Sequence, residues 1–506
     1  MKLDTDQQNL KTKLFKGQSV YSYTDWLWCA VCLGIFALLT SSFWGETYDD
    51  VFLAYQYAKN IEAGNGFVFN AGEHFLGTPA PLFVILLVAV HWILPHLTIP
   101  QIGTLISCFG LTVMAYALYA IGRYYGQRLL GAFVGLLAVC NPFSLLVLGG
   151  ESPLYLALVT SSLLMMLHRR FTVTGVLLGF ALLCRTEALI PIAVVVGIFI
   201  VSERRVPKSL LAAVVCTVLP WIAFAFWEFG SPLTNSFIAK VAQVRSGRKP
   251  FPFGFARWFQ RIVFGPHPLL LCSLLPATIG AWAIATKAAP YRLVAVWGLA
   301  QTAAYCFMPI PFYHWYAAHV GVLGAVLVGV GTWALIQPAQ DAGRSSAFKR
   351  KLVCIATCAC TVLTTIESLR IAHAYRQHWP HAPANELYVQ TGQWFKEHSE
   401  PGARIAYLEI GQIAFYADRY IIDTLGLVTP DVAQEVAKRN WIWPLRRYKP
   451  DYIIFNSVFT KWPESGAIFN EAWFTEGFRE ETQISTASYP APLVIYKRLP
   501  GAVVPD

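Results

Sequence analysis

The chain has 506 residues, of which 56% are apolar and only 13% are charged, and its mean hydropathy is +0.47. Soluble domains carry about 25% charged residues, so this composition excludes a soluble protein and predicts one that crosses a membrane many times. The formal net charge is +10. Because the basic residues are scattered over short loops and form no stripe with interleaved aromatic residues, we expect no nucleic-acid partner.

Apolar runs recur along the chain from Trp26 to about Leu369. The first run follows several lysines and precedes no small-residue cleavage site, which predicts an uncleaved signal anchor behind a cytoplasmic N-terminus of residues 1–25. About eleven transmembrane helices are predicted, at 26–44, 102–122, 129–148, 153–167, 172–184, 188–202, 209–227, 267–286, 292–309, 317–336 and 351–369. One further apolar stretch, 82–97, contains Pro95 and two histidines and is predicted to be re-entrant or interfacial.

The loops that carry clustered basic residues all belong to one side of the predicted topology. These clusters lie at 168–170, 203–208, 287–292 and 344–351. Assigning them to the cytoplasm satisfies the positive-inside rule and places the C-terminus outside. We therefore expect a multi-pass protein of the bacterial cytoplasmic (inner) membrane. Its transmembrane domain would cover 26–369, with a first outer loop over 45–81.

Residues 370–506 are more polar and contain short strand-like runs separated by helical segments. The runs lie at 403–409, 420–423, 452–456 and 493–498, and a helix is predicted over 386–398. Short apolar strands alternating with helices indicate a small α/β domain. The loop charges place this soluble domain, called the tail below, on the periplasmic (extracytoplasmic) side. No internal repeat is visible in the sequence, so an inverted-repeat transporter gains no support.

Ionisable residues gather where the outer hairpins meet the membrane. They are Asp49 and Asp50 after the first span, Glu151, Arg185 with Glu187, Lys240 and His314. Charged groups at membrane depth are costly and are functional candidates by default. Because five outer connections carry polar groups while the cytoplasmic loops carry scattered lysine and arginine, we expect the functional face to be the outer one.

This set of side chains suits a lipid substrate that bears a phosphate. An aspartate can take a proton from an attacking hydroxyl as a general base, and lysine or arginine can hold a phosphate that leaves with negative charge. The pattern therefore predicts glycosyl transfer from a lipid-phosphate sugar to a hydroxyl. Two adjacent carboxylates can also hold a divalent cation, so a metal bound by Asp49 and Asp50 stays an alternative.

Each of these residues alone also has a purely structural interpretation. Two aspartates after a span are typical of a solvated helix end, and Arg185 with Glu187 is typical of an ion pair that fixes helix packing. Lys240 and His314 fit an interfacial anchor and an aromatic belt. Their joint placement on one face favours function over these alternatives.

Residues 49–82 resemble the first outer loop of GT-C glycosyltransferases, most closely that of the arabinofuranosyltransferase-like branch; they read DDVFLAYQYAKNIEAGNGFVFNAGEHFLGTPAPL. Further matches follow in the order of the family. They are Gly150-Glu151, Arg185-Thr186-Glu187, 230–240, His314-Trp315-Tyr316 and, in the tail, Gly411, Tyr416, Asp423, Gly426 and Leu427. The resemblance covers nearly the whole chain. Departures at Ser152 and Thr186 leave the sugar and the acceptor open.

The resemblance implies that a sugar, arabinofuranosyl or another pentose or hexose, moves from a polyprenyl-phosphate donor to a cell-envelope glycan, glycolipid or protein. It implies Asp49, or else Asp50, as the general base. The donor phosphate would contact Arg185, Lys240 and His314, and supporting or acceptor-binding roles would fall to Glu151, Glu187, Tyr57 and Asn70. No cofactor is implied beyond the divalent cation that the aspartate pair could hold.

Two other classes of function stay open. A polytopic lipid or solute transporter would place charges deep within its spans, whereas here they lie at the outer ends of the spans. A non-catalytic assembly protein of the envelope would use the tail as a binding module and would tolerate the loss of Asp49 and Asp50.

Overall fold

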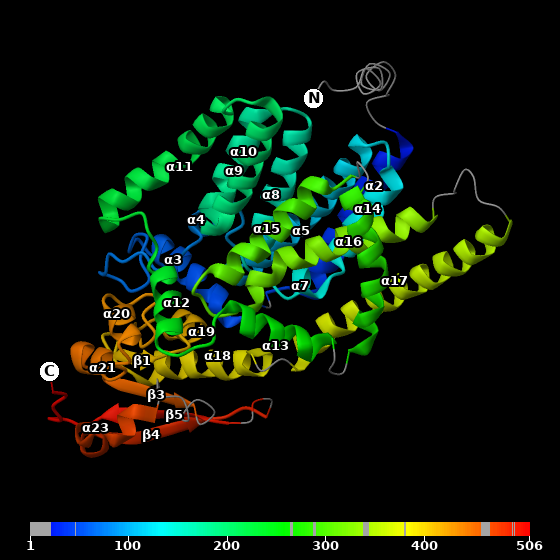
Figure 1. Ribbon diagram of the computed structural model, residues 1–506. Helices are drawn as coiled ribbons and strands as arrows, with labels where there is room; N and C mark the ends of the chain where they lie inside the picture. The colour runs from blue at the N-terminus through cyan, green and yellow to red at the C-terminus, as the bar shows by residue number, and fades with distance from the viewer. Residues whose placement is uncertain are drawn as a thin grey trace.

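The computed structural model has two parts, a bundle of membrane helices and the tail, which packs against one end of the bundle (Figure 1). The first 21 residues of the predicted cytoplasmic segment lie outside the described residues. The structure describes residues 22–45, 47–263, 267–286, 290–336, 344–378, 381–456, 466–487, 489 and 491–505.

Seven helical segments in the described part of the chain are long and apolar enough to cross a membrane. They are α2 (Tyr23–Ser42), α5 (Ile99–Tyr124), η2 with α10 (Thr186–Ala188 and Leu189–Glu203), α11 (Lys208–Phe229), η3 with α14 (Pro268–Ser273 and Leu274–Thr286), η4 with α16 (His314–Ala317 and Ala318–Ile336) and α17 (Arg344–His378). Shorter helices pack among them: α4 (Pro81–Ile93), α6 (Arg128–Val139), α8 (Ser152–Leu167), α9 (Phe171–Cys184) and α15 (Arg292–Phe307). All the predicted spans fall on helices, so the predicted polytopic helical fold is confirmed.

One predicted span, 129–148, is not a single helix. The helix α6 ends at Val139, and a separate helix, α7 (Pro142–Leu145), follows after a break. Pro142 has no N–H with which to continue a helix, and the side chain of Asn141 caps α7 by accepting a backbone N–H at 3.0 Å. Hydropathy does not predict this break, because both halves of the run are apolar.

Glycines bring the helices of the bundle close together. A Cβ on Gly280 of α14 would lie 1.9 Å from the carbonyl oxygen of Leu327 of α16. Likewise, a Cβ on Gly122 of α5 would lie 2.6 Å from the Cα of Gly131 of α6. Only glycine fits at these contacts. Small residues are the usual means by which membrane helices approach one another closely.

The first outer loop and a second long connection lie at the end of the bundle that carries the tail (Figure 1). The loop contains η1 (Asp49–Val51) and α3 (Phe52–Glu62), and the connection between α11 and η3 contains α12 (Asn235–Arg245) and α13 (Phe251–Val263). The apolar stretch 82–97 forms α4, which packs against α3, α5 and α9. Its re-entrant or interfacial position in the membrane stays a prediction.

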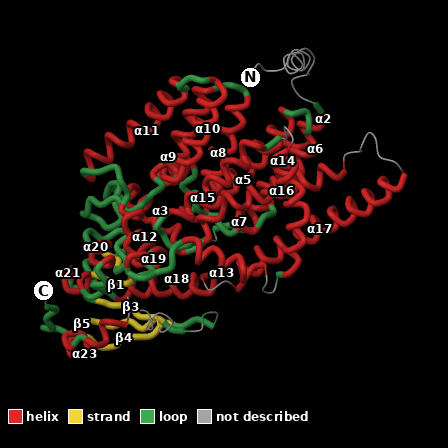
Figure 2. Tube along the Cα trace, in the orientation of Figure 1, coloured by secondary structure: helices red, strands yellow, loops and turns green. Residues whose placement is uncertain are grey.

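The tail contains a five-stranded mixed sheet in the order β2-β1-β3-β5-β4 (Figure 2). The strands are β1 (Arg404–Tyr407), β2 (Tyr420–Asp423), β3 (Tyr452–Asn456), β4 (Phe478–Ile484) and β5 (Leu493–Arg498). The strand β1 pairs in parallel with β2 and β3, whereas β5 pairs antiparallel with β3 and β4. Four strands confirm the predicted runs. The edge strand β4 is absent from the prediction because its sequence, FREETQI, leaves most of its side chains in contact with solvent.

The tail and the first outer loop share one hydrophobic core. Tyr57 of the loop packs in the same buried cluster as Leu387, Ile405 and Ile413 of the tail. The helices of the tail are α18 (His381–His398), α19 (Gly411–Ala417), α20 (Val432–Ala437), α21 (Trp443–Tyr448), η5 (Ala467–Asn470) and α23 (Ala472–Gly477). Because α17 runs on to His378, the chain continues as helix through the boundary predicted at residue 370.

Candidate active site

The carboxylate of Asp49 is held by the tail. It is 5% exposed, and it accepts hydrogen bonds from the backbone N–H groups of Gly411 at 3.1 Å and Gln412 at 2.7 Å, one on each oxygen. Both donors belong to the first turn of α19, where helix N–H groups have no partner within the helix. The neighbouring Asp50 is exposed. Of the two predicted catalytic carboxylates, one is therefore fixed in orientation and the other faces solvent.

The contact between the loop and the tail requires glycine at position 411. A Cβ there would lie 2.0 Å from the backbone carbonyl oxygen of Asp49 and 2.8 Å from its Oδ2. No side chain can occupy that space, so the absence of a Cβ lets α19 reach the aspartate with its N–H groups.

A third carboxylate, Glu409, lies beside the two aspartates, and the three together are called the acidic cluster. Burial raises the pKa of Asp49 to about 7, and the charge of Asp50 adds to this effect, while the hydrogen bonds from Gln412 and Gly411 oppose it. Burial, Asp49 and Asp50 also raise the pKa of Glu409 well above its usual value. The cluster thus brings three carboxyl groups together, and Asp49 and Glu409 hold their protons more tightly than isolated carboxyl groups do.

Two cations lie close enough to act on this cluster. The charges of Arg248 and Lys240 oppose the rise in the pKa of Glu409. Lys240, on α12, is only 7% exposed, and its Nζ lies 3.7 Å from the centroid of the Tyr313 ring. Arg248 donates a hydrogen bond of 3.2 Å to the hydroxyl of Tyr313. Cationic and anionic side chains therefore face each other in one region.

A stack of aromatic rings connects Lys240 to the first outer loop. Trp315 stacks on Tyr313 with ring centroids 4.5 Å apart and on Tyr48 with centroids 5.7 Å apart. Tyr48 precedes Asp49 in the chain and also meets the ring of His314 edge-on at 4.9 Å. The structure therefore brings the predicted residues Lys240 and His314 next to the aspartate pair.

Arg185 has a different environment from the phosphate site predicted for it. Its guanidinium, in a side chain 7% exposed, pairs with Glu151 at 2.5 Å and with Glu187 at 2.7 Å. Tyr305 donates a further hydrogen bond of 2.9 Å to Glu187. Two carboxylates already satisfy one guanidinium, and these four residues are called the inner network. The sequence predicts the charged residues of this network and offers the Arg185–Glu187 ion pair as an alternative, but it does not predict that Glu151 and Tyr305 join this pair.

The inner network lies directly beneath the first outer loop. Tyr55 donates a hydrogen bond of 2.7 Å to the carbonyl of Gly149, and Thr47 donates one of 3.1 Å to the carbonyl of Leu148. These bonds attach the loop to the turn that leads into Glu151. This turn therefore connects the inner network to the first outer loop, which carries the aspartate pair.

Tyr57 and Asn70 hold the loop and the tail in place. The buried hydroxyl of Tyr57 donates to the carbonyl of Phe75 at 2.8 Å and accepts the N–H of Gly77 at 2.7 Å. The amide of Asn70 accepts the N–H of Ile421 at 2.9 Å and donates to its carbonyl at 3.0 Å, so it pairs with the β2 edge as a strand would. Both residues support the site at a distance from the acidic cluster, and acceptor binding by them stays a prediction.

Glu409 and Arg248 are the charged residues that sequence reasoning missed. Glu409 is the last residue of the predicted strand 403–409 and stands two positions before Gly411, which matches the family pattern. The sequence did contain a signal for Glu409: an acidic residue that stands between a strand and a helix that begins at glycine. Among the described residues, no group of three His, Cys, Asp or Glu side chains is arranged to hold a metal ion.

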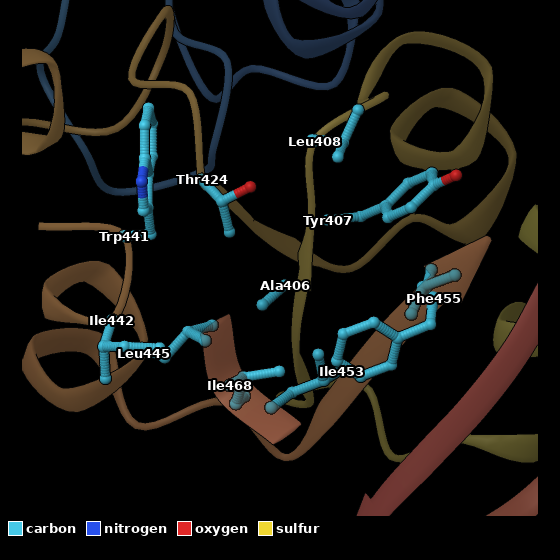
Figure 3. Close-up of a pocket in the computed structure, with 11 residues that line it drawn as sticks. Ala406, Tyr407, Leu408, Thr424, Trp441, Ile442, Leu445, Ile453, Phe455 and Ile468 are labelled. Carbon is cyan, nitrogen blue, oxygen red and sulfur yellow. The ribbon is translucent and has the colours of Figure 1, made fainter. Parts of the chain in front are cut away.

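The tail also contains a small, partly open pocket, which is lined by residues of β1, β3 and α21, among others (Figure 3). Its volume is about 30 Å³, which suits one water molecule. Trp441 and Thr424 lie on one side of it, and Ile453 and Ile468 lie on another. The residues that line it include no charged side chain, so the acidic cluster is the better candidate site.

Comparisons with solved structures find the same architecture over almost the whole chain. ArnT from Cupriavidus metallidurans bound to undecaprenyl phosphate matches with a TM-score of 0.59 and 14% identity, covering 96% of this chain and 100% of ArnT. The apo state of the same enzyme matches with a TM-score of 0.59 and 15% identity, covering 95% and 98%. The chain has the GT-C fold. The GT-C architecture predicted from residues 49–82 is therefore confirmed at the level of the fold.

A second solved structure matches with a lower TM-score. The archaeal oligosaccharyltransferase AglB from Archaeoglobus fulgidus, in complex with an inhibitory peptide and a dolichol-phosphate, matches with a TM-score of 0.51 and 12% identity. The match covers 87% of this chain and 70% of AglB. A family model described as Domain of unknown function (DUF8728) matches residues 371–493, which is most of the tail. No curated protein matches the sequence.

Proposed function

We propose that the protein is a membrane glycosyltransferase that moves a sugar from a polyprenyl-phosphate donor to a hydroxyl of a cell-envelope glycan, glycolipid or protein. The observation that carries the proposal is the acidic cluster of Asp49, Asp50 and Glu409 facing Lys240 and Arg248 on a GT-C fold. A hydroxyl nucleophile needs a base, and a phosphate leaving group needs a cation. The two requirements are met in one place.

Asp49 is the general base in this proposal. Its carboxylate removes the proton of the acceptor hydroxyl while the hydroxyl oxygen bonds to the anomeric carbon of the donor sugar. The bond between that carbon and the phosphate oxygen breaks, and the electron pair leaves with the polyprenyl phosphate. Lys240, with Arg248 beside it, stabilises the phosphate charge. The proton remains on Asp49 until water removes it.

Two properties favour Asp49 over Asp50 for this role. The N–H groups of α19 fix the orientation of its carboxylate, which provides the alignment that proton transfer needs. Its pKa, raised to about 7 by burial, is close to the value at which a base acts best near neutral pH. Asp50 then supplies negative charge that raises the basicity of Asp49.

In this scheme Arg185 does not contact the donor phosphate, because its guanidinium is paired with Glu151 and Glu187. Its role is to hold the turn before Glu151 in position beneath the first outer loop. His314, edge-on to Tyr48, lies near the phosphate side of the site. The predicted bacterial cytoplasmic (inner) membrane, with the site in the periplasm, agrees with the positions of the basic loops. The loops after α8 and α10 lie at the end of the bundle opposite to the tail (Figure 1), as the positive-inside rule expects for a tail outside.

The test is sugar transfer by purified protein in nanodiscs, with a panel of undecaprenyl-phosphate-linked sugars as donors and envelope extract as acceptor. Wild type is compared with Asp49→Asn and Asp50→Asn, each checked for folding by thermal unfolding. We expect transfer in wild type, a loss of at least a hundredfold in Asp49→Asn, and partial activity in Asp50→Asn. Equal transfer by all three would remove the aspartates from the mechanism. Movement of lipid across a bilayer without any transfer would support a transporter instead.

A further inference from the structure

The connection between α11 and η3 has an unusual charge composition. It contains six basic residues and no acidic one, and the sequence has no Asp or Glu between Glu228 and Asp341. The basic residues are Lys240, Arg245, Arg248, Lys249, Arg257 and Arg261, called the cationic row below. Positive charge is normally concentrated in cytoplasmic loops. This connection lies on the side of the tail, where α12 packs against α20 and the amide of Asn235 bonds to the carbonyl of Gly426.

The helix α13 carries the outer part of the row and is strongly amphipathic. Phe251 and Trp258 are buried against the bundle, and the helix contacts η3 and α15. Away from the bundle, Phe253 is 67% exposed, and Arg257, one turn further along the helix, and Arg261 are exposed as well. Aromatic and basic side chains exposed together on one helix are typical of a helix in the lipid headgroup region.

The row continues from α13 toward the candidate active site. Lys249 and Arg245 are exposed, Arg248 contacts Tyr313, and Lys240 is buried over the same ring. The exposed fraction of these basic side chains thus falls from the edge of the bundle to the aromatic stack around Tyr313. In the described part of the chain, no ion pair is formed by Arg245, Lys249, Arg257 or Arg261.

We propose that the cationic row is an access surface that draws the phosphate headgroup of the polyprenyl-phosphate donor from the bilayer to Lys240. This inference rests on the proposed function and adds the route by which its substrate arrives. The occupant follows from charge complementarity: the four exposed members of the row, Arg245, Lys249, Arg257 and Arg261, pair with no carboxylate in the described part of the chain, and the donor carries a phosphate at membrane level. Arg257 and Arg261 meet the headgroup first, Lys249 and Arg248 next, and Lys240 last.

The physical basis is electrostatic attraction between an anionic lipid and basic side chains at the membrane surface. The attraction falls off over a Debye length of about 8 Å at physiological salt, so each cation must lie near the next for a headgroup to pass along the row. Neighbouring members of the row are one to eight positions apart along α12, α13 and the link between them, which provides such a series. Salt would weaken the outer part of the row most, because those side chains are exposed.

The test measures binding of undecaprenyl phosphate to the full chain in phosphatidylcholine nanodiscs, by native mass spectrometry. In these nanodiscs the probe is the one anionic lipid. We expect Arg257→Gln with Arg261→Gln to weaken binding about tenfold at low salt, and the loss to shrink at 0.5 M salt. The charge-conserving pair Arg257→Lys with Arg261→Lys restores binding. The matched control, Arg204→Gln with Lys208→Gln, removes two exposed cations at the opposite end of the bundle and leaves binding unchanged.

Separate outcomes would overturn the inference and the proposed function. If the Arg257 and Arg261 glutamine variant binds undecaprenyl phosphate as wild type does, the inference is wrong and the proposed function stands. If wild type does not bind undecaprenyl phosphate, the proposed function fails and the inference falls with it. If the variant loses binding of soluble polyphosphate but keeps binding of the lipid, the row serves a soluble anion and the inference is wrong.

Discussion

The backbone N–H of Gln412 donates a hydrogen bond of 2.7 Å to Oδ1 of Asp49, although 363 positions separate the two residues. The bond joins the first turn of α19 in the tail to the first outer loop. The tail is therefore a wall of the candidate active site, and its position determines how the carboxylate of Asp49 is oriented.

Replacing Gly411 by alanine would separate the tail from the loop. The new Cβ would lie 2.0 Å from the carbonyl oxygen of Asp49, so α19 must move and both N–H bonds to the carboxylate would lengthen. We expect a loss of about 1–3 kcal/mol of stability and a much larger relative loss of transfer activity. Thermal unfolding and the transfer assay on the same preparation measure the two effects.

Gly402→Ala is the control for this change. Gly402 also lies in the tail, but a Cβ there would meet no atom within 4 Å. This variant should keep wild-type stability and activity. If Gly411→Ala behaved like Gly402→Ala, the contact between α19 and Asp49 would have no role in the reaction.

The rate of transfer should rise with pH as Asp49 ionises. Burial raises the pKa of this carboxyl to about 7, and a base must be ionised to accept a proton. We expect kcat/KM to increase through about pH 7 and to level off above it. Asp50→Asn removes a charge that raises this pKa, so its profile should shift to lower pH. Glu476→Gln, an exposed change in the tail, should leave the profile in place.

The same pKa has a consequence for stability, with the opposite sign. The pKa of Asp49 is about 7 in the folded chain and 3.8 for an ordinary aspartate, so between these values the folded chain holds a proton that the unfolded chain releases. The contribution of Asp49 to stability is present in full below pH 3.8 and is lost as pH rises through about 7. The Tm of wild type should therefore fall from pH 5 to pH 8 more steeply than that of Asp49→Asn. Equal slopes would mean that the carboxyl is ionised throughout this range.

The sequence predicts the part of the site that comes from the loops of the bundle. Asp49, Asp50, Lys240 and His314 are recognisable because each is a charged or ionisable residue in a connection on the predicted outer side. The structure brings them together. Glu409 could not be placed with them, because nothing in the sequence says that the tail folds back onto the first loop.

The choice between alternative partners for a charged side chain is the second property that the sequence leaves open. Arg185 and Glu187 stand out as charges at membrane depth, but whether the arginine faces a phosphate or two carboxylates depends on how α8 and α9 pack. The edge strand β4 is missed for a related reason. Its charged residues are typical of a loop, and the segment is a strand because it pairs with β5.

Asn70→Ala should weaken the attachment of the first loop to the β2 edge. The amide of Asn70 satisfies both the N–H and the carbonyl of Ile421, and the side chain is 4% exposed. Losing it leaves two buried backbone groups without partners, which costs about 1–3 kcal/mol for each group. Asn65→Ala is the matched control, since Asn65 is exposed and bonds only within the loop. A Tm for Asn70→Ala equal to that of Asn65→Ala would contradict this role.

Arg185→Gln distinguishes a positioning residue from a phosphate ligand. The change would leave Glu151 and Glu187 facing each other, with side chains only 14% and 13% exposed. Breaking a buried ion pair on one side costs about 3–5 kcal/mol, so we expect a large fall in Tm. The triple variant with Glu151→Gln and Glu187→Gln removes the unpaired charges and should recover most of the Tm.

Binding of undecaprenyl phosphate decides between the two roles. If Arg185 acts by positioning, the triple variant should bind this lipid with a Kd close to that of wild type, because Lys240 and Arg248 remain. Its transfer rate would still be reduced, since the turn beneath the first loop is held less firmly. If Arg185 binds the phosphate directly, the triple variant would regain its Tm without regaining affinity for the lipid. That combination would restore Arg185 to the donor site and would mean that donor binding separates it from Glu151 and Glu187.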